Sequence, residues 1–530
     1  MSEKAISDLV QVAMKGEYDI PEFQREFIWK PTQVADLADS LSLGYPIGCL
    51  VVWKSATTEG KEQIYVVDGQ QRITALCVMF GERPHWKDPK EWEVISATYT
   101  PYLSVSSEGK FFFGRKRGES ISLSLREILA KKSKEEIDAL ISETLDATKT
   151  PVRSQARTIL YEKAMQVWNT RLGCKLPIVD IAVQDPMEVA EIYQRLNQLG
   201  TRIRETDTQL AFIAVKNPGW VKSVFRSFIK DLESNTNGRW PLSPGDLLRC
   251  MTILYSATPR VGNIKEPEKF WESGCKVTFD QLKNAISDVL PRLERYGVQA
   301  INEVPSNYTL IALFSLHARF SKEKKYDFGA LFRWFLSANV TGRYGDAPLE
   351  RLTKDAGQFM KSANLSEALK ALDSEILEGE IARELEEELA KPFNKRSAGA
   401  LLLKVLLWNK ADDWRKGGKL SNYPPLEWHH IIPSKFIKSM VVADESVANN
   451  ISNMTPLSAE ANKEFKDKPP WIYAPNFIQD PTRLESHFIP KSYAKAFIAG
   501  KPIKDTQELS KFFLERLKLI QRESKQLLGL

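Results

Sequence analysis

The stretch of sequence that decides the fold of the C-terminal region reads EWHHIIPSKF (residues 427–436) and then NNISNMTPLSAEANKEF (residues 449–465). A short strand that ends at the adjacent histidines His429 and His430 points their side chains to opposite sides, so the two rings need not have the same role. The polar loop after this strand returns as a helix at about 458–465, which can present Asn462 toward the same centre. The pattern predicts a strand, a loop and a helix that bring polar side chains together.

These residue types suit the hydrolysis of a phosphodiester bond. The reaction needs a base that activates water and a cation that stabilises charge on the scissile phosphate and the leaving 3′ oxygen. Histidine suits the role of base because its unperturbed pKa is about 6.5. A hard cation such as Mg²⁺ keeps several waters, so one histidine and one asparagine can be the protein's share of its ligands. Each feature alone also fits a structural role, since asparagines in such a stretch commonly form turns.

Together, H-H-I-I-P, N-M-T-P-L and an asparagine nine positions after Asn453 resemble the HNH (ββα-metal) nuclease motif. The resemblance implies that His430 is the general base and that His429, which precedes it, is a metal ligand. It implies that Asn453, which opens the second strand, orients the base or the loop. It makes Asn462, on the closing helix, the second metal ligand.

The same resemblance indicates which ligands this segment binds. Histidine stands at position 429, where the family commonly has aspartate, and this shifts the expected metal from Mg²⁺ toward Mn²⁺ or Ni²⁺. Lys463 and Lys466 fall where basic residues of such enzymes contact DNA phosphate. From Lys391 to Leu530 the chain has 23 Lys and Arg against 14 Asp and Glu, a net charge of +9, whereas the remainder has −3. This distribution fits a contact with the DNA backbone, although a solvated lysine-rich surface explains the charge equally well.

A second polar motif, VVDGQQRITAL (residues 66–76), lies where a predicted strand meets a predicted helix. Backbone N–H groups at the start of a helix favour an anion, and Arg72 adds a guanidinium group suited to phosphate. Gly69 would let the backbone approach a ligand closely. A capped turn with an ion pair between Arg72 and Asp68 is the structural alternative, and the residues alone do not choose between the two interpretations.

The N-terminal stretches PEFQREFIWK (21–30), YPIG (45–48), VDGQQR (67–72) and IYQRLNQLGT (192–201) resemble the DGQQR domain of GmrSD-type restriction proteins, itself similar to ParB and sulfiredoxin. The resemblance spans about residues 5–215 and implies binding and hydrolysis of a nucleoside triphosphate. Since the sequence has no P-loop motif, such a site would differ from that of P-loop enzymes. The residues assigned to the nucleotide are Asp68, Gly69, Gln70, Gln71 and Arg72, with Gln24, Arg25, Asn197 and Thr201 as candidates for a sensor or second face.

Composition and length set the remaining expectations. The 530 residues are 43% hydrophobic and 27% charged, which is typical of globular proteins, and they suggest about three domains. No apolar run is long enough for a membrane span and no signal peptide is evident, so we expect a cytoplasmic protein without a membrane partner. The five cysteines contain no C-x-x-C pair, which argues against a zinc ribbon or a disulfide framework.

The order of expected elements gives the fold class. Short strands are expected at 49–53, 64–67, 111–118 and 177–183, helices at 31–44, from 70 onward and over most of 123–171, and a helix–turn–helix at 188–215 with Thr206 or Asp207 as cap. The chain then reads as mainly helical to about 390, and a last helix is expected at 397–414. We therefore predict a multidomain α+β protein with a ParB/sulfiredoxin-like α/β domain (1–215), a helical region (216–390) and an HNH domain with surrounding helices (391–530).

The two resemblances predict a metal-dependent DNA endonuclease of a type IV-like restriction or anti-phage defence system. It would cut modified DNA under control of an N-terminal domain that binds or hydrolyses a nucleoside triphosphate. Two alternatives remain open: a nucleotide-gated DNA-binding regulator that cuts weakly or not at all, and an HNH nuclease without modification dependence. The sequence leaves the DNA modification, the nucleotide and a homo-oligomeric state undetermined.

Overall fold

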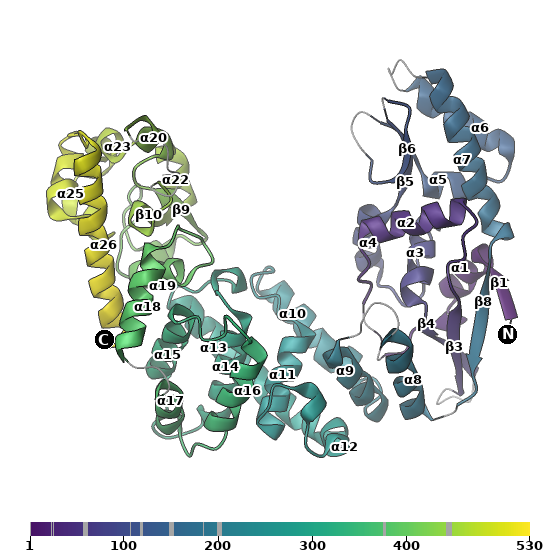
Figure 1. Cartoon of the computed structure of the whole chain (residues 1–530), viewed down its shortest axis with the longest axis horizontal. Helices are drawn as coiled ribbons and strands as arrows, with labels where there is room; N and C mark the ends of the chain where they lie inside the picture. The colour runs from purple at the N-terminus through teal and green to yellow at the C-terminus, as the bar shows by residue number, and fades with distance from the viewer. Residues whose placement is uncertain are drawn as a thin grey trace. The chain divides into compact units, whose positions relative to one another are not determined.

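The computed structural model describes residues 2–22, 24, 26–56, 62–106, 108–116, 120–147, 153–183, 185–198, 204–374, 378–440 and 448–530. They form two compact units, Met1–Val221 and Lys222–Leu530, which we describe separately (Figure 1). The first unit mixes strands and helices and the second is largely helical, which confirms the predicted α+β class. The predicted division at residues 215/216 and 390/391 stays a prediction.

A mixed five-stranded sheet forms the centre of the first unit, in the order β1 (Ser2–Ala5), β8 (Lys175–Ile181), β3 (Leu50–Ala56), β4 (Glu62–Asp68), β2 (Tyr18–Asp19). β3 pairs antiparallel with β4 and parallel with β8, and β8 in turn pairs antiparallel with β1. The predicted strands at 49–53, 64–67 and 177–183 are confirmed, with ends shifted by at most three residues. The apolar runs of β3 and β4 are buried because both strands lie inside the sheet.

Helices and a second, small sheet share one hydrophobic core with this sheet. The small sheet has the order β6 (Phe111–Gly114), β5 (Tyr102–Val105), β7 (Ile121–Ser124), so the region expected to be helical from 123 begins with the end of a strand. The helices of this unit are α1 (Ile6–Lys15), α2 (Pro31–Ser42), α3 (Gln70–Phe80), α4 (Pro89–Tyr99), α5 (Leu125–Ala130), α6 (Lys134–Asp146), α7 (Arg153–Gly173), α8 (Pro186–Gln198) and α9 (Glu205–Lys216).

The predicted helix–turn–helix at 188–215 corresponds to α8 and α9, but the predicted cap of the second helix is wrong. Arg204 occupies the N-cap position, without a side-chain capping bond, and Thr206 and Asp207 lie inside the first turn of α9. Thr206 is buried, so packing rather than capping fixes its place.

The second unit begins with helices that pack on one another: η1 (Val221–Arg226), α10 (Ser227–Asn235), α11 (Pro244–Ser256), η2 (Val261–Asn263), α12 (Pro267–Lys269), η3 (Phe270–Gly274), α13 (Cys275–Arg295), η4 (Ile301–Glu303), α14 (Asn307–Phe320), α15 (Phe328–Val340), α16 (Pro348–Phe359), α17 (Leu365–Asp373) and α18 (Glu378–Ala390). Helix α14 is apolar nearly all round because α11, α13, α15 and α16 surround it. Within the described residues, no helix combines the length and the apolar character needed to cross a membrane.

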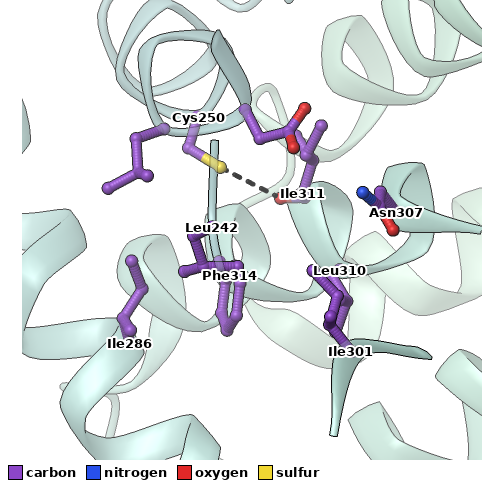
Figure 2. Close-up of a pocket in the computed structure, with 10 residues that line it drawn as sticks. Leu242, Cys250, Ile286, Ile301, Asn307, Leu310, Ile311 and Phe314 are labelled. Carbon is purple, nitrogen blue, oxygen red and sulfur yellow. Dashed lines mark hydrogen bonds between the residues drawn. The ribbon is translucent and has the colours of Figure 1, made fainter. Parts of the chain in front are cut away.

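A small cavity lies among α11, α13 and α14, lined mainly by aliphatic side chains (Figure 2). Its volume is about 10 Å³, which is room for one water at most. Cys250 lies at its edge and donates a weak hydrogen bond to the carbonyl oxygen of Ile311 at 3.7 Å. The cavity is therefore a local packing defect and too small for a substrate.

The C-terminal part of the second unit surrounds a two-stranded sheet. Its elements are α19 (Ala398–Trp408), η5 (Leu420–Asn422), β9 (Leu426–His430), α20 (Ser434–Met440), η6 (Ile451–Asn453), β10 (Met454–Ser458), α22 (Ala459–Phe465), α23 (Pro470–Phe477), α24 (Pro481–Glu485), α25 (Lys491–Ile498) and α26 (Thr506–Leu528). The helix expected at 397–414 ends at Trp408, because Asp412 and Asp413 turn the chain back in a loop. Helix α26 packs on α15, α18, α19 and η6, which ties the small sheet to the helical region.

Candidate functional site

Strands β9 and β10 and helix α22 form a ββα arrangement, with α20 and η6 between the two strands. β9 and β10 are antiparallel, with His430 opposite Met454 and His429 opposite Thr455. Ser458 ends β10 and caps α22, since its hydroxyl accepts a hydrogen bond from the N–H of Ala461 at 3.2 Å. The helix therefore returns directly over the strands, and it contacts both. The predicted strand at the histidines and the predicted helix at about 458–465 are confirmed, whereas the segment between them, predicted as a loop, contains α20, η6 and β10.

Asn453 holds the loop that follows β9. Its side chain is fully buried. Its Oδ1 accepts from the N–H of Ile432 at 2.8 Å, and its Nδ2 donates to the carbonyl oxygens of Ile432 and Ala448, both at 2.9 Å. All three bonds are to the main chain of the loop. Two roles were predicted for Asn453, orientation of the base or of the loop, and these bonds fit orientation of the loop.

His429 is buried and faces α22. Its Nδ1 lies 2.9 Å from Oδ1 of Asn462, and aromatic rings of Trp414, Phe465 and Tyr473 pack against its ring. Burial lowers the pKa of His429 to about 4, so the ring is neutral at physiological pH. Its Nε2 is buried and has no hydrogen-bond partner among the described residues, which leaves the Nδ1 edge as the polar face of the ring.

The pair formed by His429 and Asn462 fits a shared divalent cation. Two ligand atoms at adjacent positions of an octahedral cation, each at about 2.1 Å, lie about 3.0 Å apart. The observed separation of Nδ1 and Oδ1 is 2.9 Å. In this structure Nδ1 donates to the amide oxygen, so a cation at Nδ1 would replace that proton, which would move to Nε2. A neutral imidazole is the form that binds metal, and burial is the largest cause that keeps this ring neutral.

Glu427 joins this pair, and the sequence interpretation missed it. Its Oε2 accepts from Nδ2 of Asn462 at 2.7 Å, which directs Oδ1 of the same amide toward His429. The signal in the sequence was the two-residue spacing of Glu427 and His429, because residues i and i+2 of a strand lie on one face. Among the described residues, no group of three or more His, Cys, Asp or Glu side chains is placed to hold a metal. With His429 and Asn462 as its protein ligands, a cation here would take its other ligands from water and substrate.

His430 projects from the other face of β9 and is partly exposed. Its Nε2 lies 2.9 Å from Oδ1 of Asn449, a residue that the sequence interpretation did not single out. Lys463 and Lys466 are exposed, and neither forms an ion pair with a described residue. Lys463 lies in the last turn of α22 and Lys466 is its C-cap residue, with a φ of 32°, so both lysines lie at the C-terminal end of the helix that carries Asn462.

A buried polar layer supports the ββα arrangement from behind. Arg516 of α26 is fully buried and donates to the carbonyl oxygens of His487 and Ile451 at 3.0–3.2 Å. Both ring nitrogens of His487 are bonded, to Thr455 of β10 at 2.6 Å and to the carbonyl oxygen of Asp412 at 2.9 Å. Burial lowers the pKa of His487 to about 3, so this histidine is a neutral structural residue.

In the first unit, the residues of the DGQQR motif brace two loops. Arg72 donates to Asp68 at 2.8 Å and to the carbonyl oxygen of Ile47 at 3.0 Å. Gln71 accepts from the N–H of Ile28 at 2.9 Å. Gln24 is buried, and its Nε2 donates to two carbonyl oxygens of β4, those of Val66 and Val67. The distance to the oxygen of Val67 is 2.7 Å. The ion pair that the structural alternative expected is therefore present.

The glycines of this region permit close approach of the chain. Gly69 has a φ of 100° and is the N-cap of α3, which no described side chain caps. A Cβ atom at Gly48, whose φ is 86°, would lie 2.4 Å from Nη1 of Arg72, so a larger residue here would displace the guanidinium group from this position. Gln70 is buried in the first turn of α3. Arg25, Thr201 and the side chain of Asn197 lie outside the described residues, so their predicted roles stay predictions.

Comparison with known proteins relates the first unit to a described family. Residues 6–214 match the GmrSD restriction endonuclease, N-terminal domain. The chain is also similar to an uncharacterized protein of Methanocaldococcus jannaschii, with 22% identity over 539 residues, 90% of this chain and 87% of the relative. The predicted resemblance of the N-terminal region is thus confirmed. The family match ends before β9, so the assignment of the C-terminal residues depends on their geometry.

Proposed function

We propose that the protein is a metal-dependent HNH endonuclease that cuts DNA in a type IV-like, modification-dependent restriction system. The observation that carries the proposal is that the two adjacent histidines lie on opposite faces of β9 with different partners. His429 meets Asn462 on the buried side at a spacing suited to a cation, while the adjacent, partly exposed His430 has one ring nitrogen without a hydrogen bond to a described residue. The match of residues 6–214 to a restriction endonuclease domain makes DNA the expected substrate.

The roles of the residues follow from their positions. His430 takes a proton from water, the water oxygen forms a bond to phosphorus, and the bond from phosphorus to the 3′ oxygen breaks with its electron pair on that oxygen. His429 and Asn462, with Glu427 behind the amide, would hold Mg²⁺, Mn²⁺ or Ni²⁺. When bound, the cation supplies positive charge near the scissile phosphate and the leaving oxygen. Lys463 and Lys466 are free to meet phosphates on either side.

The nuclease proposal is tested by cleavage of phage DNA with Mg²⁺ or Mn²⁺. We expect the intact protein to cut and His430→Ala to lose cutting, because the base is removed while the buried core is untouched. His85→Ala is the matched control, since His85 is an exposed histidine of the other unit. Absence of cleavage by the intact protein on every DNA would contradict the proposal and favour a nucleotide-gated DNA-binding regulator.

Metal binding is tested without DNA by titration with Mn²⁺ in a calorimeter. We expect Asn462→Ala to weaken binding, because the amide supplies one of two expected protein ligands. The control is Asn476→Ala, because Asn476 is an exposed asparagine of α23 whose amide, among the described residues, donates within its own helix, to the carbonyl oxygen of Ile472. Equal Mn²⁺ affinity of the two variants would remove the assignment of this site.

Dependence on modified DNA is the part of the proposal that rests most on the N-terminal match. Glucosylated, hydroxymethylated, phosphorothioated and unmodified DNA of one sequence would be compared in the same cleavage assay. Preferential cutting of one modified DNA supports the type IV assignment. Equal cutting of all four leaves an HNH nuclease without modification dependence.

We further propose that the DGQQR motif binds a nucleoside triphosphate that controls cutting. No described side chain caps the first turn of α3, which carries no acidic residue and contains Arg72, an arrangement that suits a phosphate. A phosphate would compete with Asp68 for Arg72, so binding would also release the braced loop at Ile47.

The nucleotide proposal is tested by NTP hydrolysis and binding of Arg72→Ala. The matched control is Arg157→Ala, which breaks another Arg–Asp pair of the same unit, with Asp138 at 2.7 Å. We expect loss of hydrolysis in the first variant alone. Normal hydrolysis by Arg72→Ala would undo the assignment of the motif.

A further inference from the structure

The hydrogen bond of His430 decides which of its nitrogens can act as a base. Nε2 lies 2.9 Å from Oδ1 of Asn449. An amide oxygen only accepts, so Nε2 carries the proton of the neutral ring. The lone pair is then on Nδ1, to which the described residues offer no hydrogen bond. Among the described residues, the neutral ring is thereby left with one open acceptor.

Asn449 is held in place from outside the ββα arrangement. Its main-chain oxygen accepts from the N–H of Phe393 at 2.6 Å, and its neighbour Asn450 forms a β-bridge with Pro392. The ring of Phe393 packs edge-on against Trp428, with centroids 4.8 Å apart. Trp428 lies on the same face of β9 as His430, two residues earlier. The segment before α19 therefore fixes both the face that bears His430 and the asparagine that bonds it.

We propose that Asn449 is a positioning residue that holds His430 in the Nε2–H tautomer, with Nδ1 open to the attacking water. The inference rests on the proposed nuclease function. Asn453 cannot do this, because all three of its side-chain bonds go to the main chain of the loop. Asn449 in NNISN reads as a turn residue in the sequence, and only the folded chain brings its amide to the histidine.

The first test is a double-mutant cycle in single-turnover cleavage with Mn²⁺. Asn449→Leu keeps the shape of the side chain but removes the acceptor, and we expect the rate to fall about 10- to 100-fold with DNA affinity unchanged. Asn449→Asp keeps an oxygen acceptor and should retain most of the rate. In the His430→Ala background, Asn449→Leu should cause no further loss, since a residue that acts through His430 has nothing left to position. Asn476→Leu is the control for a harmless change of an exposed asparagine.

The second test observes the tautomer directly by ¹⁵N NMR of the full chain with labelled histidine. The chain has five histidines, so His430→Ala identifies the signal. We expect His430 to be the Nε2–H tautomer in the wild type and a mixture in Asn449→Leu. This measurement does not depend on whether the protein cuts DNA.

Several outcomes would overturn the inference. Wild-type cleavage by Asn449→Leu, while His430→Ala is inactive, would show that the bond has no catalytic role. A further loss of residual activity when Asn449→Leu is added to His430→Ala would show that Asn449 acts elsewhere. An Nδ1–H tautomer in the wild type would refute the geometry. Absence of cleavage by the wild type would overturn the proposed function. The NMR measurement of the tautomer would still be possible in that case, so failure of the proposed function can be told apart from failure of this inference.

Discussion

Replacement of Asn453 by alanine should open the loop that follows β9 without unfolding the unit. The side chain is fully buried and makes three hydrogen bonds to the main chain of the loop, two of them to Ile432. At a net value of about 1 kcal/mol each, their loss costs about 3 kcal/mol, which corresponds to a roughly hundredfold larger opening constant for the loop. Cleavage should fall with it, since the loop connects the strand that carries His430 to the rest of the site.

Hydrogen exchange measured by mass spectrometry is the appropriate assay, because it reports local opening in a chain of two units. Peptides that cover residues 426–436 should exchange faster in Asn453→Ala, whereas peptides from α13 and α14 should not change. Asn453→Asp has the shape of asparagine but loses both donors, and its carboxylate would face the carbonyl oxygens of Ile432 and Ala448. It should therefore be about as damaging as alanine. Wild-type protection of residues 426–436 in either variant would refute the reasoning, and Asn476→Ala is the control.

Three further predictions concern stability and reactivity. Arg516→Met should lower the melting temperature of the second unit, because buried carbonyl oxygens lose their donors at a cost of about 2–4 kcal/mol. Burial lowers the pKa of Arg516 to about 9, so removal of this buried charge offsets part of the cost. An unchanged melting curve would argue against the prediction. The pKa of His429 is about 4 and that of His487 about 3, both below the unfolded value of about 6.5. The contribution of these two neutral rings to the free energy of unfolding is therefore complete above pH 6.5 and is lost as the pH falls toward 4. The urea midpoint should fall over the same range, and a midpoint independent of pH from 7 to 4 would contradict this prediction. Alkylation of the native protein should spare Cys77 and Cys250, whose pKa values burial raises, until urea unfolds the chain, as peptide mass spectrometry would show.

Much of the fold could be predicted because the decisive signals are local. The apolar runs at 49–53 and 64–67 became β3 and β4, and Pro31 opens α2 as its fixed φ favours. The cap of α9 could not be placed from the sequence, since Thr206 is buried by packing that the local pattern does not record. The predicted helix at 397–414 failed for a related reason. Its last six residues bend back because the carboxylate of Asp413 accepts from the main chain of Arg415, Lys416 and Ser458.

The sequence by itself determined which residues of the C-terminal site lie on strand, loop and helix, because alternation along β9 separates His429 from His430 and the cap at Ser458 starts the helix that carries Asn462. Only the tertiary structure decided the partners. Asn462 meets His429 across 33 positions and Asn449 meets His430 across 19. Such pairings arise from packing of the ββα arrangement against α19 and α26, and no local periodicity encodes them. For the same reason the structure brought in Glu427, Phe393 and Arg516, whose residue types in the sequence are those of ordinary surface, core and basic positions.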